Sequence, residues 1–152
     1  MDAFVVPSNS RGIPKHYPTS KFIELTGMNL ARELQPHTPL AIGSALVTAA
    51  GKMRARHLIH VPDTEEPGGR VQVEDVLRAT SAVLVACQVR GFNSIAVPLM
   101  GAFDRGIPAE EAARAIHSQI RSHRGDRPTR VTLAATTPDE VEVFELAMEG
   151  VS

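Results

Sequence analysis

The sequence predicts an α/β protein in which helices cover both faces of a central sheet. Two observations carry this prediction. Short apolar runs rich in β-branched residues recur along the chain, and they alternate with stretches whose apolar residues recur every three or four positions. The expected order is strand, helix, strand, strand, helix, strand, helix, strand, helix. Strands and helices that alternate at these lengths are typical of a sheet with helices packed on it and right-handed crossovers between parallel strands.

The first strand is predicted at Ala3–Val6, where a compact apolar run is ended by Pro7 and a polar loop. Two further prolines in that loop argue against regular structure there. A helix is expected to begin at residue 19 or 20, to pause at Gly27 and to resume over 29–34.

Two more strands are predicted at 44–50 and 57–61, joined by a brief connection. The composition of segment 62–70 is typical of a surface loop, and its glycines and acidic residues form no motif that indicates catalysis or ligand binding. A helix is predicted over 73–89 because its apolar residues lie along one side, and Gly91 stands where that helix should end. The remaining elements are strands at Ile95–Pro98 and 130–135, and helices at 109–123 and from Pro138 onward.

A loop bracketed by Gly101 and Gly106 joins the strand at Ile95–Pro98 to the helix at 109–123. Such a loop gathers backbone N–H groups and a helix N-terminus at the carboxyl end of a strand, which makes a ready site for a phosphate. The same two glycines also suit any tight turn between a strand and a helix. The spacing alone leaves both interpretations open.

The amino-acid composition limits the classes of protein to which this chain can belong. The 152 residues fit one domain over 1–152, and 43% hydrophobic with 22% charged residues is ordinary for a soluble globular protein. A net charge of −1 gives no electrostatic reason to expect nucleic acid or an anionic membrane as a partner. Without a long apolar run or a signal peptide pattern, the expected location is the cytoplasm. The single cysteine, Cys87, excludes an internal disulfide, and the histidine spacing suggests no metal site, so no metal or cofactor is expected.

Several segments of the chain resemble the macro domain family. Met1-Asp-Ala-Phe-Val-Val-Pro-Ser-Asn-Ser10 resembles the family's entry strand and its Asn-Ala-Ala-Asn turn. Gly43–Thr48 followed by Arg56–His60 resembles its Gly-Glu-Ala strand and its Tyr-Val-Ile-His strand. Asn93–Pro98 and Gly106–Ala113 resemble the strand before and the helix after its second phosphate loop. The resemblance covers nearly the whole chain in the right order.

This resemblance implies a three-layer α/β/α fold with a central mixed sheet and a cleft for ADP-ribose. The implied function is binding of ADP-ribose, a related nucleotide or ADP-ribosylated partners. One alternative is a hydrolase acting on ADP-ribose derivatives, which is less favoured because no residue after Asn9 supplies the expected acid. The other alternative is a degenerate module without a nucleotide ligand that acts in assembly.

The resemblance also implies roles for particular residues. Asp2 matches the aspartate that accepts a hydrogen bond from adenine, and a solvated terminal carboxylate is its alternative. Asn9 matches the asparagine that contacts the distal ribose and would be catalytic only in a hydrolase; local bonding in a turn is its alternative. Ser10 follows it in the same turn. The diphosphate is expected on the loop residues Gly101, Ala102, Phe103, Asp104, Arg105 and Gly106.

The chain departs from the family at both phosphate loops. The segment Lys15–Phe22 contains no glycine, although a backbone that approaches a phosphate closely favours glycine. In the second loop Phe103 replaces a glycine, Asp104 brings a negative charge and Arg105 takes a position that often carries an aromatic side chain. Either the cations Lys15, Lys21 and Arg105 replace the backbone donors, or Tyr17 and Phe103 fill the cleft so that it binds nothing.

A leading strand usually precedes the entry strand in the family, and this sequence begins without it. A bare sheet edge exposes unpaired backbone groups. We therefore expect a strand from a second subunit to cover the edge, which makes the protein a homodimer.

Overall fold

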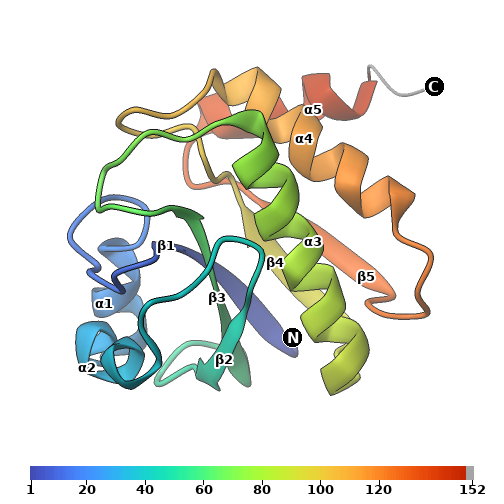
Figure 1. Ribbon diagram of the computed structural model, residues 1–152. Coiled ribbons are helices and arrows are strands. Elements are labelled where there is room, and N and C mark those ends of the chain that lie inside the picture. Colours follow the sequence, from blue (N-terminus) through green and yellow to red (C-terminus); the bar gives the residue numbers. More distant parts are fainter. Residues whose placement is uncertain (150–152) are drawn as a thin grey trace.

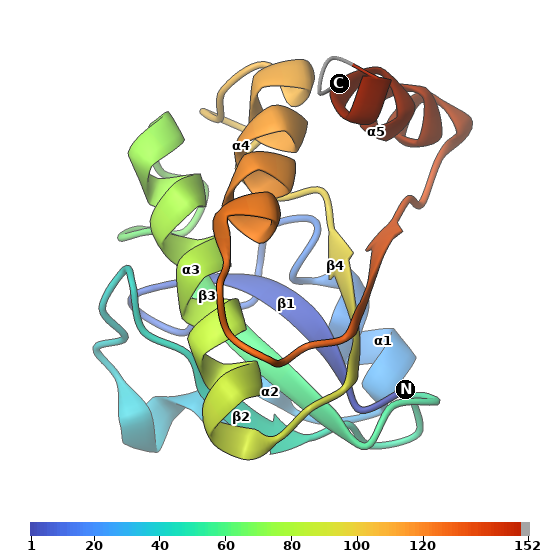
Figure 2. The ribbon, with the colours of Figure 1, turned by 90° about the vertical axis from the view of Figure 1, so that its right-hand side faces the viewer.

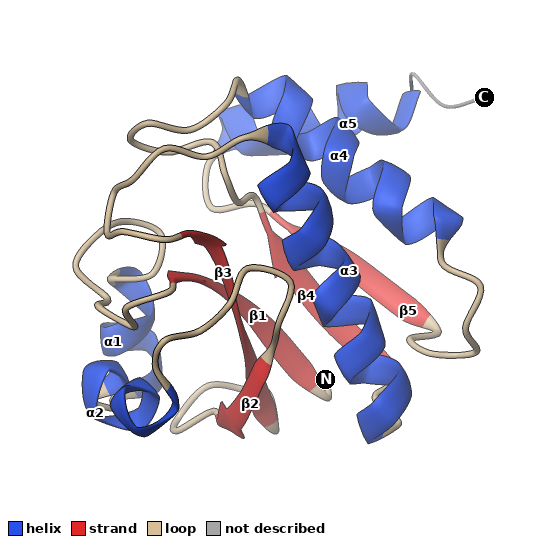
Figure 3. Ribbon diagram, in the orientation of Figure 1, coloured by secondary structure: helices blue, strands red, loops and turns tan. Residues whose placement is uncertain are grey.

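The structure is a computed structural model that describes residues 1–149, so the last three residues of the predicted domain lie outside it. One five-stranded sheet runs through it (Figure 3). Across the sheet the order is β2-β3-β1-β4-β5, with β2 antiparallel to β3 and the other neighbours parallel, so the sheet is mixed as predicted. The strands are β1 (Ala3–Asn9), β2 (Leu46–Ala49), β3 (His57–Thr64), β4 (Ser94–Pro98) and β5 (Arg130–Ala134).

Helices lie on both faces of the sheet, with α3 and α4 on one face and α1 and α2 on the other (Figures 1 and 2). The predicted order of strands and helices is confirmed, except that the first helical region is divided in three. No helix within residues 1–149 is long and apolar enough to cross a membrane. The helices are α1 (Lys21–Thr26), α2 (Leu30–Leu34), the 3-10 turn η1 (Gln35–His37), α3 (Val73–Arg90), α4 (Ala109–Ser122) and α5 (Pro138–Glu149).

The central strand β1 is apolar on both faces because alternate side chains of a strand point to opposite sides. Val5 belongs to the buried cluster that includes Val76 of α3, whereas its neighbour Val6 packs with Phe22 of α1 and Leu30 of α2. Both valines are fully buried. A strand enclosed in this way holds its carboxyl end, where Asn9 lies, in a fixed position.

Two glycines end helices where the sequence predicted. Gly27 follows α1 with φ 68° and Gly91 follows α3 with φ 72°, and both lie in the left-handed region that glycine adopts without steric cost. At the other end of α3 the carboxylate of Asp75 accepts a hydrogen bond from the Gln72 N–H at 2.8 Å. This bond satisfies one of the free donors at the start of the helix.

The predicted ends of two strands are wrong. β1 was expected to stop before Pro7 and β3 at Val61, but β1 continues to Asn9 and β3 to Thr64. Pro7 and Pro62 each remove one backbone N–H donor from the ladder without breaking the pairing of the two strands. Pro7 still lies opposite Val61, and Pro62 lies opposite Ser8. The extension matters for function, since it carries polar residues beyond the core to the carboxyl edge of the sheet.

Candidate functional site

A small cavity lies at the carboxyl ends of β1 and β3. It is covered by residues 13–20, which we name the covering segment, and bounded on another side by the turn 99–107 after β4. Its volume is about 40 Å³, which is room for only a few water molecules. Ligands of open α/β sheets bind at this edge, outside the carboxyl ends of the strands. The polar residues around it include Ser8, Asn9, His16, Asp63, Thr64 and Asp104.

The covering segment is fastened to the turn after β4 by side chains. The ring of Tyr17 meets the ring of Phe103 edge-on, with 4.9 Å between the ring centroids. Beside it, His16 Nδ1 lies 3.4 Å from Asp104 Oδ2. The hydroxyl of Tyr17 also shares a hydrogen bond of 2.7 Å with the hydroxyl of Thr136. These contacts close the cleft to its small volume.

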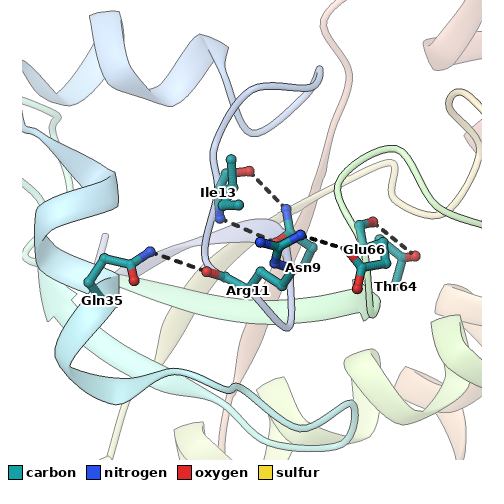
Figure 4. Close-up of polar contacts among 6 residues, drawn as sticks. All are labelled: Asn9, Arg11, Ile13, Gln35, Thr64 and Glu66. Atoms are coloured by element: carbon teal, nitrogen blue, oxygen red, sulfur yellow. Dashed lines mark hydrogen bonds and ion pairs between the residues drawn. The ribbon is translucent and has the colours of Figure 1, made fainter.

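Asn9 shapes the turn that leads into the covering segment. Its Nδ2 donates to the Ile13 carbonyl at 2.8 Å, and its Oδ1 accepts from the Ile13 N–H at 3.2 Å (Figure 4). The side chain borders the cavity but is only 4% exposed. Both ends of the amide are therefore engaged in local backbone bonding, which is the alternative that the sequence left open for this residue.

The residues after Asn9 are held to neighbouring segments through their backbone. Ser10 donates its N–H to the Thr64 carbonyl at 3.0 Å, and its own carbonyl accepts from the Leu40 N–H at 2.8 Å. Next in the chain, the exposed pair Arg11 and Glu66 meets at 3.1 Å (Figure 4). Ser10 is thus part of the frame of the cleft, and its hydroxyl is not among the groups that line the cavity.

The two glycines of the 101–106 loop are required by close packing. Gly101 has φ 81°, and a Cβ atom there would overlap Cγ2 of Val76 on α3. A Cβ atom on Gly106 would overlap the Gly101 carbonyl oxygen, which accepts a hydrogen bond from the Ile107 N–H at 2.8 Å. The loop is thus closed on itself, which favours the tight-turn interpretation of the glycine spacing.

The other four residues of this loop face different surroundings. Ala102 and Phe103 pack against the apolar cluster between α4 and α5. Asp104 has a positive φ of 55° and turns toward His16. The Arg105 side chain lines a separate groove outside the cavity, while its carbonyl accepts from the Val71 N–H at 3.2 Å.

The charges around the cavity are mainly acidic. Neither of the predicted replacement lysines, Lys15 and Lys21, lines it, and Arg105 does not line it either. Among residues 1–149, the ionisable side chains that border it are His16, Tyr17, Asp63 and Asp104. Within the described part of the chain, the cavity is therefore bordered by no lysine or arginine side chain that could bind a diphosphate.

Asp63 is the ionisable group that the sequence analysis missed. It stands near the carboxyl end of β3, is 8% exposed and borders the cavity. Burial raises its pKa to about 7, and the charge of Asp75 acts in the same direction, although the Gly101 N–H near the carboxylate opposes the change. The prediction that β3 ends at Val61 hid this residue, because it assigned Asp63 to a surface loop.

Asp2 does not belong to this site. It precedes β1, at the end of the strand opposite Asn9, and its Oδ2 accepts from the Asn93 N–H at 2.6 Å and the Ser94 N–H at 3.1 Å. These two bonds lower the pKa of Asp2. Its carboxylate ties the start of β1 to the start of β4, and the structure does not bring Asp2 together with the other predicted site residues.

Residues 1–149 contain no group of three or more histidine, cysteine or acidic side chains placed to hold a metal ion. Cys87 is fully buried in the core, and burial raises the pKa of its thiol to about 12. Such a thiol remains protonated at neutral pH and is a poor nucleophile.

Comparison with known proteins identifies the fold and the family. The Macro domain family model matches residues 5–116. An uncharacterized protein of Aquifex aeolicus is 35% identical over 144 residues, which cover 95% of this chain and 87% of that protein.

Solved structures have the same fold. A macrodomain variant of Oceanobacillus iheyensis with ADPR aligns with a TM-score of 0.85 at 17% identity, covering 99% of this chain and 86% of that one. The Trypanosoma brucei macrodomain in complex with ADP-ribose aligns with a TM-score of 0.83 at 21% identity, covering 97% and 63%. With the family match and the Aquifex relative, these findings lead to one conclusion: this chain belongs to the Macro domain family.

Proposed function

We propose that the cleft at the carboxyl ends of β1 and β3 binds ADP-ribose or a related nucleotide. The observation that carries the proposal is a polar cavity, with Asn9, Asp63 and Thr64 around it, at the edge where open α/β sheets bind ligands. The macrodomains of similar fold that were solved with ADPR or ADP-ribose support the same ligand class.

Binding requires the covering segment to move, because about 40 Å³ cannot hold a nucleotide. The contacts to be broken include the edge-on pair of Tyr17 with Phe103, the hydrogen bond of Tyr17 with Thr136 and the half-exposed pair of His16 with Asp104. An aromatic pair contributes about 0.5–1.5 kcal/mol and an exposed ion pair at most about 1 kcal/mol. The hydrogen bond adds about 0.5–1.5 kcal/mol, so opening costs roughly 1–4 kcal/mol. Such a cost lowers the apparent affinity by about one to three orders of magnitude and leaves binding measurable at millimolar ligand.

Titration calorimetry with ADP-ribose tests this proposal. We expect saturable heat with the wild-type chain, and a dissociation constant roughly two- to tenfold lower for Tyr17→Ala, because this change removes contacts made only in the closed cleft. Val89→Ala is the matched control, since Val89 is 78% exposed on α3 and should leave binding unchanged. The absence of heat at millimolar ADP-ribose with both wild type and Tyr17→Ala would overturn the proposal and favour a module without a nucleotide ligand.

A second proposal concerns assembly of two chains. We infer that a second copy covers β5, which is one of the two outer strands of the sheet and pairs only with β4 within residues 1–149. Unpaired backbone groups along such an edge are complementary to those of an identical strand. Beside the edge, a groove of about 550 Å³ is lined by apolar side chains, including Val141 and Met148, which are 45% and 50% exposed.

Light scattering at micromolar concentration tests the dimer. We expect the mass of two chains for the wild type and of one chain for Met148→Glu, because the new charge would be buried at the contact. Val89→Glu, on the exposed side of α3, should remain dimeric. A wild-type monomer across this concentration range contradicts the inference.

A further inference from the structure

We propose that the end of the molecule opposite the candidate site binds the phosphate backbone of double-stranded nucleic acid without reading its sequence. Six exposed arginines carry this inference. We name them the basic end: Arg54, Arg56, Arg90, Arg121, Arg124 and Arg130. The inference is independent of the proposed binding of ADP-ribose, because none of the six residues lines the cavity at the carboxyl ends of β1 and β3.

The fold brings separate segments of the chain together at the basic end. The ring of His57, at the start of β3, stacks on the ring of Phe92 after α3, with 5.1 Å between the ring centroids. The Arg130 N–H, at the start of β5, donates to the Asn93 carbonyl at 2.9 Å. The starts of these strands and the end of α3 therefore lie side by side, at the lower right of the molecule in Figure 1.

The loop between α4 and β5 is fixed against the end of α3. The Arg127 N–H donates to Gln88 Oε1 at 3.0 Å, and Arg127 Nη1 donates to the Gly91 carbonyl at 3.2 Å. Within the loop, His123 Nε2 lies 2.7 Å from the Arg127 carbonyl oxygen. Arg127 is thus used to build the loop, which holds the exposed Arg124 close to the last turn of α3.

Few carboxylates balance the cations of the basic end. Only two acidic residues, Asp2 and Asp126, lie in the segments that form it, which are 1–3, 50–57, 88–94 and 121–130. Asp2 already accepts hydrogen bonds from two backbone N–H groups. Within residues 1–149 none of the six arginines forms an ion pair. Their charges are therefore available to a partner.

The net charge of −1 hides a separation of charge along the molecule. Acidic residues gather at the opposite end, where α3, α4 and α5 each have a pair of them in the first turn. Arg90 and Arg121 stabilise the helix dipoles at the ends of α3 and α4, but the other four arginines of the basic end lie outside helices. Helix stabilisation does not account for those four, whereas a basic face of this kind attracts a polyanion.

The chemistry of the basic end suits the backbone of a duplex. A guanidinium group forms paired hydrogen bonds with phosphate oxygens. Single-strand binding uses exposed rings that stack on bases, and the only exposed phenylalanine or tyrosine within residues 1–149 is Tyr17 of the covering segment. Membrane binding uses a broad apolar face beside the cations. Of the large exposed apolar side chains, only Met1 and Val89 lie in the segments of the basic end.

Fluorescence anisotropy with labelled DNA and RNA duplexes of about 20 base pairs tests this inference. We expect at least one duplex to bind with a dissociation constant of about 1–100 µM at 50 mM salt, and the ratio of the two affinities identifies the preferred duplex. With about four arginines on phosphates, affinity should fall about 100-fold between 50 and 200 mM salt. The double variant Arg90→Glu with Arg124→Glu should bind at least tenfold more weakly at 50 mM salt.

The matched control is the double variant Arg78→Glu with Arg114→Glu, which changes the net charge by the same amount. Both residues are exposed on α3 and α4, and about 18 Å of helix separates Arg78 from Arg90. Its affinity for the duplex should change less than threefold. Thermal melts confirm that both double variants are folded, and titration with ADP-ribose should give the same result for both as for wild type.

Four results would overturn the inference while leaving the proposed function intact. They are the absence of duplex binding at 100 µM protein and 50 mM salt, equal losses for the two double variants, tighter binding of a single strand than of the duplex, and tighter binding of phosphatidylserine vesicles than of the duplex. The last result would assign the basic end to an anionic membrane surface.

Discussion

Replacing Asp63 by asparagine is expected to stabilise the protein above neutral pH, by up to roughly 4 kcal/mol. Burial raises the pKa of this carboxyl from 3.8 to about 7, so between these values the folded chain binds a proton that the unfolded chain has released. The contribution of Asp63 to the free energy of unfolding therefore falls by about 1.4 kcal/mol per pH unit as pH rises from about 4 to 7. Above pH 7 this contribution is constant. Asparagine fills nearly the same volume and carries no charge to desolvate.

Urea denaturation of wild type and Asp63→Asn at pH 4, 5.5, 7 and 8.5 measures this effect. The difference in the free energy of unfolding between the two proteins should grow with pH and level off above 7. Asp104→Asn is the control, since its side chain is 45% exposed on the same cavity and its removal should change little at any pH. A difference independent of pH would show that Asp63 ionises at an ordinary pKa.

Gly101→Ala is expected to destabilise the protein by roughly 2–5 kcal/mol. Part of the cost, about 1–2 kcal/mol, is the left-handed backbone at φ 81°, which a residue with a Cβ atom adopts unfavourably. The rest arises because the new Cβ atom would overlap Val76, which is fully buried on α3, and overpacking a core costs about 1–3 kcal/mol.

Gly91→Ala separates these two contributions. Gly91 has nearly the same backbone, with φ 72°, but no atom lies within 4 Å of the position that its Cβ would take. Its substitution should cost only about 1–2 kcal/mol in the same chemical denaturation experiment. Equal losses for the two variants would mean that the turn after β4 relaxes freely, and the packing explanation of Gly101 would be wrong.

The sequence predicts the order of the elements because that information is local. Apolar periodicity marks α3, and Gly27 and Gly91 end their helices through a backbone conformation that favours glycine. The ends of β1 and β3 could not be predicted in this way. Prolines at 7 and 62 are read locally as strand ends, whereas the pairing of β1 with β3 maintains both strands past them.

The candidate site is less predictable because it depends on which segments meet in space. Alignment with the family places Asp2 in the ligand site, but its carboxylate is engaged at the start of β4. Asp63 belongs to no recognisable sequence motif, and its burial depends on the covering segment and on the turn after β4. A signal was nevertheless present: Asp63 follows an apolar run that ends at the same sheet edge as Asn9.

The central claim is that the cleft at the carboxyl ends of β1 and β3 binds ADP-ribose or a related nucleotide. A crystal structure of the protein with ADP-ribose tests it most directly. We predict ADP-ribose between the covering segment and the turn after β4, with Tyr17 displaced from Phe103. A ligand bound elsewhere on the protein, or a cleft that remains closed and empty at millimolar ADP-ribose, would contradict this account.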